Sequence, residues 1–194
     1  MDDIPEARLR VIEAAQGLLN ERGYNAVTMK DIADSLDIKA ASLYYHFPQG
    51  KEEMFAVVTE YTFMQHHTGM MQALAAAGDS LPARLLAIAN WFGSQKPLNL
   101  LAMVHSDMPA VGPEARERIE AALYRCIYRP VFNVFDHAQR TGESRPVDPD
   151  IMTGTFLSLI DGIYYATEAI DSAPPFGVTA DQIIDVLVEG LRPR

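Results

Sequence analysis

The stretch TMKDIADSLDIKAASLYYHFPQGKEEMF, residues 28–55, decides the fold of this chain. Thr28 is followed three residues later by Asp31, which is close to the pattern of a helix capping box and predicts that a short helix begins here. Asp37 and Ile38 leave room only for a tight turn before a further helix starts. The stretch therefore predicts two short helices in close succession.

The second of these short helices should end abruptly. Pro48 disfavours helical geometry at the residue before it, so the helix should run to about His46 and Phe47 should leave it. A long helix then begins at Lys51. Because apolar periodicity also predicts a helix over residues 5–22, three short helices joined by tight turns precede the long one, as a helix-turn-helix requires.

Helix signals continue along the rest of the chain, and strand signals are nearly lacking. Capping patterns, prolines and apolar periodicity predict further helices at about 81–93, 97–107, 114–140, 149–171 and 180–191. Pro130 should kink the segment that contains it. The predicted fold is all-α with about nine helices, divided into a three-helix helix-turn-helix domain over residues 1–50 and a larger helical domain over residues 51–194.

Three short motifs, T-x-x-D-I-A, S-L-Y-Y-H-F and G-K-E-E, follow one another within residues 28–55. In this combination they resemble the DNA-binding signature of the TetR family of transcriptional repressors, and the detailed resemblance covers about residues 5–60. The resemblance implies a homodimeric repressor that binds operator DNA and is released by a small-molecule effector, with the larger domain serving ligand binding and dimerisation. Because one fold hosts many functions, it does not identify the effector.

The third short helix carries the predicted contacts to double-stranded DNA. Its Leu43 side should face the core, which turns short polar, phenolic and imidazole groups toward phosphates and base edges. Of the first three side chains, Lys39, Ala40 and Ala41, only the lysine can form hydrogen bonds. Base recognition should therefore also use methyl contacts and DNA shape. Taken singly, such residues more often have a packing or surface role, and it is the whole string that favours DNA contact. The predicted DNA-binding residues are Lys39, Ala40, Ala41, Ser42, Tyr44, Tyr45 and His46, with Thr28 and Lys51 as phosphate contacts that the resemblance implies.

The charge and composition of the chain further limit its possible functions. The net charge of −10 argues against a general polyanion binder, because affinity for phosphates comes mainly from Lys and Arg. Residues 38–51 nevertheless contain no carboxylate, which favours a local DNA-binding surface. The single cysteine, Cys126, excludes an internal disulfide and, with an acidic N-terminus that lacks a secretory signal, predicts a cytoplasmic protein. The apolar stretch 151–170 contains two carboxylates, which argues against a membrane span.

The last two helices predict a homodimer. Each has apolar residues on two faces, and a four-helix bundle across a two-fold axis would bury the second face of both. A larger monomer core would explain the same pattern. With two recognition helices about 34 Å apart, the operator should be nearly palindromic. The predicted interface residues are Met152, Phe156, Leu159, Ile163, Ile184, Leu187, Val188 and Leu191.

The middle helices contain many aromatic, Met and His residues, which fit an apolar ligand pocket with a few polar anchors. The same residues at helical spacing also fit an ordinary core. The direction in which ligand and DNA binding are coupled is not contained in the sequence. The candidate pocket residues are Phe63, His67, Met70, Trp91, Met103, His105, Phe132, Phe135 and Asp161.

Three other function classes fit the sequence less well. A metal site could draw on His66, His67, His105 and Asp107, but adjacent histidines on a helix point about 100° apart and no Glu-x-x-His motif occurs, so we expect neither a metal nor another cofactor. An enzyme is disfavoured because nucleophile-elbow, dinucleotide, Walker and zinc-protease motifs are missing, although a His105, Asp107 and Asp161 cluster is conceivable. A helical ligand-binding or scaffold protein without DNA binding remains the main alternative.

Overall fold

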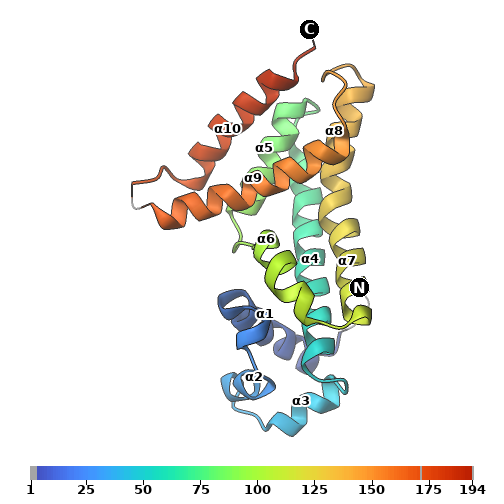
Figure 1. Ribbon diagram of the computed structural model, residues 1–194, viewed down its shortest axis with the longest axis vertical. Helices are drawn as coiled ribbons and strands as arrows, with labels where there is room; N and C mark the ends of the chain where they lie inside the picture. Colours follow the sequence, from blue (N-terminus) through green and yellow to red (C-terminus); the bar gives the residue numbers. More distant parts are fainter. Residues whose placement is uncertain (1–3, 171, 194) are drawn as a thin grey trace. The chain divides into compact units, whose positions relative to one another are not determined.

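The computed structural model describes residues 4–170 and 172–193, and within them it contains helices and no β-strand. The all-α fold predicted from the sequence is confirmed (Figure 1). The α-helices are α1 (Glu6–Ala26), α2 (Met29–Ser35), α3 (Ala40–His46), α4 (Lys51–Ala76), α5 (Leu81–Gly93), α6 (Leu100–Ala102), α7 (Pro113–Leu123), α8 (Arg129–Arg140), α9 (Pro149–Ala169) and α10 (Phe176–Leu191). Between them lie the π-helical turns η1 (Met103–Asp107) and η3 (Tyr124–Tyr128) and the 3-10 turn η2 (Met108–Ala110).

Several of these elements join end to end. α6, η1 and η2 form one run, and α7, η3 and α8 form another, so the described residues contain nine helical runs. The disturbance predicted at Pro130 takes the form of η3, which ends two residues before this proline. Because proline lacks an N–H, the carbonyls of the preceding turn lose a regular partner, and a π-helical turn supplies another.

The chain folds as two compact units. The first contains the described residues up to Met64 together with Leu101–Leu123, and the second contains Gln65–Leu100 and the described residues from Tyr124 onward. α4 contributes residues to both. The domain boundary that we predict after residue 50 lies at the start of α4, inside the first unit, and stays a prediction.

The core of the first unit connects its three N-terminal helices. Ile12 of α1, Ile32 of α2 and Leu43 of α3 are each at most 1% exposed. The turn between α2 and α3 places Asp37 at φ 54°, a conformation that Asp tolerates better than most residues. Phe47 leaves the helix at φ −136° and is fully buried, as the proline that follows it predicts.

The end of α1 departs from regular geometry at Gly23. This residue has φ 76° and ψ 168°, so the helix is interrupted where the sequence predicts that it ends. One further turn follows, and it brings the ring of Tyr24 against that of Phe55, with the centroids 4.7 Å apart. The first helix is thereby joined to α4.

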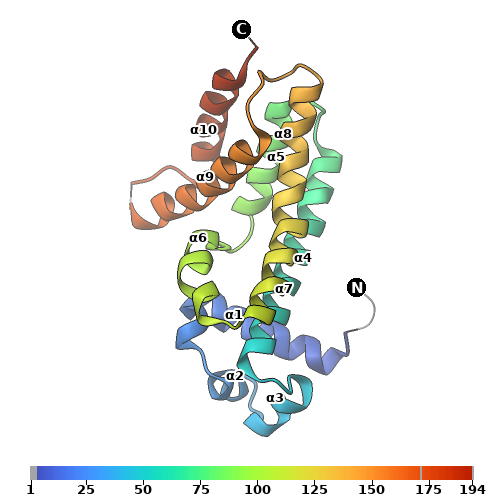
Figure 2. The ribbon, with the colours of Figure 1, turned by 45° about the vertical axis from the view of Figure 1, so that its right-hand side comes forward.

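In the second unit α5 packs along α10, and α8 packs along α9 (Figures 1 and 2). Tyr164 of α9 donates hydrogen bonds to the carbonyl oxygens of Phe92 and Gln95 at the end of α5. The prediction that the last helix starts near residue 180 is wrong, since α10 begins at Phe176. The reason is tertiary: the Phe176 ring lies 4.6 Å from that of Tyr164 and covers Gly93, so the earlier turn is held by packing.

Two remaining expectations concern the ends of helices and the membrane. The helix predicted to reach residue 171 ends at Ala169, and residue 171 lies outside the described residues. Among the helices that the structure describes, none is both long and apolar enough to cross a membrane.

Candidate nucleic-acid interface

α3 turns one apolar side inward and a polar, aromatic side outward. Leu43 is fully buried, whereas Tyr44 is 50% and Tyr45 85% exposed. An exposed tyrosine presents both a ring face and a hydroxyl group that can donate to a phosphate oxygen. Two neighbouring tyrosines that reach solvent from one seven-residue helix therefore form a ready contact surface for a polyanion.

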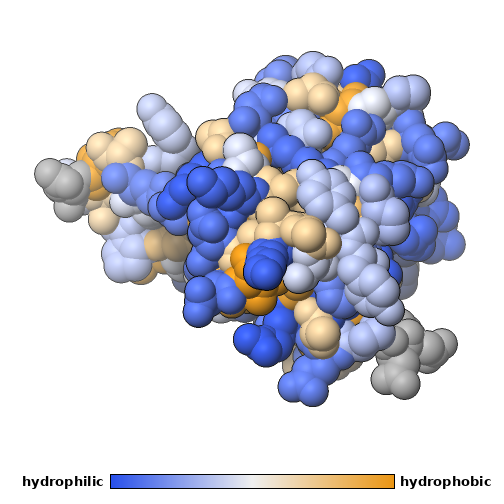
Figure 3. Space-filling view, turned by 90° about the horizontal axis from the view of Figure 1, so that it is seen from below, coloured by the Kyte–Doolittle hydropathy of each residue, from blue (hydrophilic) through white to orange (hydrophobic). Residues whose placement is uncertain are grey.

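The other predicted contact residues lie around these tyrosines. Lys39, Ala41 and Ser42 are exposed, while Ala40 and His46 are half-buried. Figure 3, which views the molecule from the side where α2 and α3 lie in Figure 1, shows mainly hydrophilic side chains with hydrophobic patches among them. Such a mixed surface suits contacts to sugar and phosphate together with methyl contacts to bases.

The turn after α3 fixes the tyrosine and histidine rings. The rings of Tyr45 and His46 meet edge to face, with centroids 5.3 Å apart. Gly50 has φ 80°, and a Cβ atom at this position would lie 3.5 Å from Cε1 of Tyr44. Tyr44 therefore packs against the turn and still reaches solvent, so packing and contact are compatible roles for it.

Thr28 caps α2 and shares its hydrogen bonds with Asp31. The Thr28 backbone N–H donates to Asp31 Oδ2 at 2.8 Å, and the Asp31 N–H donates to Thr28 Oγ1 at 3.1 Å. The hydrogen bond from the Thr28 hydroxyl, at 2.6 Å, holds the pKa of the Asp31 carboxyl below its usual value. The predicted capping box is confirmed, and a phosphate at this helix start would compete with Asp31 for the same donors.

Lys51 is less free than an ordinary surface lysine. Its Nζ lies 4.1 Å from the centre of the Tyr24 ring, and the side chain is half-buried. Partial burial lowers the pKa of Lys51, and the negative charge of Asp107 partly opposes this effect. The ammonium group therefore lies between the end of α1 and the η1 turn, and its role as a phosphate contact stays a prediction.

A family model for bacterial regulatory proteins of the tetR family matches residues 11–58, which contain α2, α3 and the start of α4. Over these residues the chain is similar to the DNA-binding segment of the TetR family. The chain is 43% identical over 54 residues to the Staphylococcus epidermidis negative transcriptional regulator IcaR of the biofilm operon icaADBC, and 50% identical over 42 residues to IcaR of Staphylococcus aureus. These matches span only 29% and 23% of the length of the two relatives.

Solved structures extend the likeness from the TetR signature to the whole fold. A crystal structure of AibR in complex with isovaleryl coenzyme A and operator DNA has a TM-score of 0.73 at 23% identity, covering 97% of this chain and 99% of that one. A putative transcriptional regulator from Saccharomonospora viridis in complex with choline has a TM-score of 0.77 at 22% identity, with coverage of 97% and 99%. At these identities the likeness shows a shared fold.

The predicted pocket residues differ widely in exposure. Phe63, Met70, Met103 and Phe135 are buried, His67, Trp91, Phe132 and Asp161 are half-buried, and His105 is exposed. In the first unit Met103 lines a hollow of about 310 Å³ together with Val104, Met108, Pro109, Arg116, Glu120 and Leu123. The pocket as predicted draws residues from both units, and it stays a prediction.

The predicted interface residues lie largely inside the protomer. Met152, Phe156, Ile163, Ile184 and Leu191 are buried within the single chain, and Leu159, Leu187 and Val188 are half-buried. Other apolar side chains of the same helices reach solvent instead, among them Ile151 at 63%, Tyr165 at 76% and Val186 at 73% exposure. Leu157, Ile160 and Tyr164, which form the second apolar face of α9, are buried as well, so both faces belong to the protomer core and the exposed side chains form a separate, narrower outer stripe.

Two residues that sequence reasoning left outside the predicted sites have well-defined surroundings. Asp107 accepts a hydrogen bond from the Tyr24 N–H of α1, and His66 is 6% exposed beside Trp91 and Phe92. The spacing of Thr59, Thr62 and Met70 along α4 would have placed His66, and not His67, on the buried side. Asp107 gives no comparable local signal, because its partners are distant in sequence.

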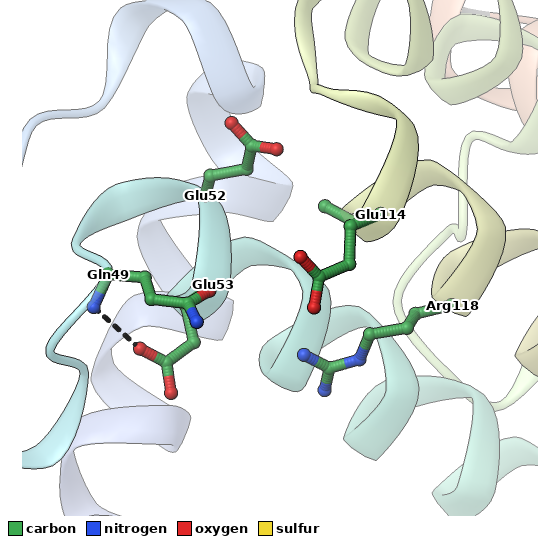
Figure 4. Close-up of a pocket in the computed structure, with 6 residues that line it drawn as sticks. Gln49, Glu52, Glu53, Glu114 and Arg118 are labelled. Atoms are coloured by element: carbon green, nitrogen blue, oxygen red, sulfur yellow. Dashed lines mark hydrogen bonds between the residues drawn. The ribbon is translucent and has the colours of Figure 1, made fainter.

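A small acidic hollow lies beside the start of α4 in the first unit. It measures about 170 Å³ and is lined by Gln49, Glu52, Glu53, Glu114, Ala115 and Arg118. Figure 4 shows Glu114 and Arg118 reaching from α7 toward α4, where the Gln49 N–H donates to Glu53. Glu52 accepts from the Gly112 N–H at 2.8 Å, and Arg118 forms a two-point ion pair with Glu60. These bonds hold α7 to α4 within a few turns of α3.

In residues 4–170 and 172–193, no three His, Cys, Asp or Glu side chains are grouped so that they could bind a metal ion.

Proposed function

We propose that this chain is a cytoplasmic transcriptional repressor of the TetR family, and not an enzyme, that binds a near-palindromic operator as a homodimer and is released by a small-molecule effector. The observation that carries this proposal is the outward pair Tyr44 and Tyr45 on a short helix held by the buried Leu43. Carboxylates are lacking from residue 38 to residue 51, so the surface can approach phosphates although the whole chain is acidic. The IcaR relatives support the repressor role, and the AibR complex supports the operator and the effector.

The direct test replaces Tyr44 and His46 by alanine in one variant. We expect operator affinity to fall about tenfold or more, because each side chain offers a phosphate or base contact that alanine lacks. A matched control is Tyr124→Ala, since Tyr124 is 52% exposed but belongs to the second unit. The operator is obtained by selecting genomic DNA fragments with purified protein. Unchanged affinity in the double variant, with circular dichroism also unchanged, would contradict the DNA-binding role of α3.

The proposed dimer uses the outer stripe of α9 and α10. On α9 the residues Ile151, Gly154, Ser158, Gly162 and Tyr165 are exposed at helical spacing, and a Cβ at either glycine would meet open space. Small residues between larger apolar ones let two helices approach closely. On α10 the exposed Val178 and Val186 extend the apolar surface. The half-buried Leu187 and Val188 lie next to this surface in sequence.

Sedimentation tests this interface. Tyr165→Glu combined with Val186→Glu places charges on two side chains that are 76% and 73% exposed in the protomer, so the monomer should still fold. We expect this variant to sediment as a monomer at concentrations where the wild type is a dimer. Tyr124→Glu serves as the charge control. A variant that remains fully dimeric would exclude this stripe as the interface.

A further inference from the structure

Two ring nitrogens in the second unit are buried without a hydrogen-bond partner. These are Nδ1 of His66 on α4 and Nε1 of Trp91 on α5. The two rings meet edge to face with centroids 6.3 Å apart, and His66 also stacks on Phe92 at 5.4 Å. A buried polar group without a partner is costly, so two such nitrogens on rings in contact favour a bound group that can satisfy them.

The backbone is shaped to admit the indole ring at this point. A Cβ atom on Gly69 would lie only 2.1 Å from Cζ2 and Cη2 of Trp91, so any other residue at position 69 would displace the ring. Gly69 lies three residues after His66 and therefore on the same side of α4. This close approach holds the indole against the helix turn that carries the imidazole.

The chemistry of the two nitrogens limits what can bind. The indole Nε1–H is a donor only, and a neutral imidazole can donate from Nδ1. Burial lowers the pKa of His66 to about 4, so the ring is uncharged at neutral pH and offers no positive charge to a carboxylate. A cation is also disfavoured, because both nitrogens would present N–H groups to it. The complementary group is therefore an uncharged acceptor, and a carbonyl oxygen has the two lone pairs needed for both donors.

The surroundings add an apolar requirement. Phe92 covers one face of the imidazole and is 3% exposed, and Met70, next to Gly69 in the chain, is fully buried. Methionine side chains adapt to ligands of varied shape. A molecule that reaches the two nitrogens must consequently bury its own chain among apolar side chains.

We propose that His66 and Trp91 form the polar end of a binding site for small, apolar, uncharged carbonyl compounds such as esters, ketones or amides. The carbonyl oxygen accepts from Trp91 Nε1–H and from His66 Nδ1–H. That the bound compound also acts as the effector rests on the function proposed above, whereas the site itself does not.

Trp91 is the only tryptophan in the chain, so its fluorescence reports on this site alone. The full-length protein is titrated with methyl hexanoate, with hexanoate as its charged counterpart and with hexyltrimethylammonium as a cation. We expect a saturable change in emission with the ester and none with the two charged probes. His66→Phe keeps a ring of similar size and removes Nδ1, so ester affinity should fall at least tenfold. His137→Phe, which changes a half-buried histidine on α8 of the same unit, should bind the ester as the wild type does.

The outcomes separate the site from the function. The site is refuted if esters, ketones and amides of this length give no saturable change up to their solubility, or if His66→Phe binds the ester as tightly as the wild type. Equal binding of hexanoate would refute the requirement for an uncharged acceptor. Thermal unfolding of His66→Phe checks the fold, and its midpoint should stay the same or rise because an unpaired polar group is removed. Saturable binding without any effect on operator affinity would leave the site standing and refute its role as effector site.

Discussion

Oδ1 of Asp107 accepts a hydrogen bond from the backbone N–H of Tyr24 at 3.1 Å, although the two residues are 83 positions apart. The neighbouring Asn25 side chain donates to the Ser106 carbonyl at 3.3 Å, so the η1 turn is bonded twice to the end of α1. The Tyr24 ring in turn contacts Lys51 and Phe55 at the start of α4. A displacement of η1 would therefore act on α1 and α4 together, on either side of α2 and α3.

Replacing Asp107 by alanine tests this connection. The part-buried Tyr24 N–H would lose its acceptor, and we expect a loss of about 1–3 kcal/mol in the free energy of unfolding. Hydrogen exchange at the Tyr24 amide should become faster. Asp107→Asn keeps an acceptor oxygen and should lose less. Equal exchange rates in the wild type and the alanine variant would show that the bond does not hold the end of α1.

The cap of α2 gives a second prediction. Thr28→Ala removes the hydroxyl that accepts from the Asp31 N–H and should cost about 1 kcal/mol of stability, measured by urea denaturation. Operator affinity should fall as well, because α2 positions α3 against the common core. Asp34→Ala, an exposed change in the same helix, is the control and should stay within about 0.5 kcal/mol of the wild type. A cap variant as stable as this control would count against the capping role.

The packing of the Trp91 indole against Gly69 gives a third prediction. Gly69→Ala places a methyl group where the indole lies and should destabilise the protein by about 1–3 kcal/mol through overpacking. Gly17→Ala is the matched control, since Gly17 is a helical glycine with open space around its Cβ position. This change should stabilise α1 by about 0.5–1 kcal/mol. Urea midpoints, followed by circular dichroism, decide between these opposite signs.

The burial of His66 should make the free energy of unfolding fall when the pH is lowered. Its pKa is about 4 in the folded protein against about 6.5 in the unfolded chain, so the unfolded state binds the proton first as the pH falls. Stability from this group is complete above pH 6.5 and is lost between pH 6.5 and 4, by on the order of 3 kcal/mol in total. The difference in unfolding free energy between the wild type and His66→Phe isolates this effect from carboxylates. A difference that is independent of pH would mean that His66 is solvated.

Local patterns in the sequence predicted the helix-turn-helix well. The cap at Thr28, the exit at Phe47 and the inward Leu43 depend on neighbours within a few residues, and the structure has all three. The start of α10 was missed because the contact of Phe176 with Gly93 joins residues far apart in sequence.

The difference between local and tertiary contacts also explains what could not be predicted for the helices after α4. Periodicity identified two apolar faces on α9, and the protomer buries both. The exposed stripe from Ile151 to Tyr165 gives no apolar signal, because small and polar residues lie between its two ends. The hydrogen bond that joins Asp107 to α1 carries no local signature at all. Residues whose roles depend on tertiary partners therefore remained outside the predicted sites.

The π-helical turn η3 has a consequence for the evolution of the α7–α8 run. A π-helical turn accommodates one residue more than the α-helix around it, as a single inserted amino acid would produce. Deleting one position between Tyr124 and Tyr128 should therefore convert this turn into regular α-helix. Because the π-helical turn absorbs the extra residue, Val131, Val134 and Phe135 should still face the core that buries them, so homologues that lack this residue should keep the same apolar pattern downstream.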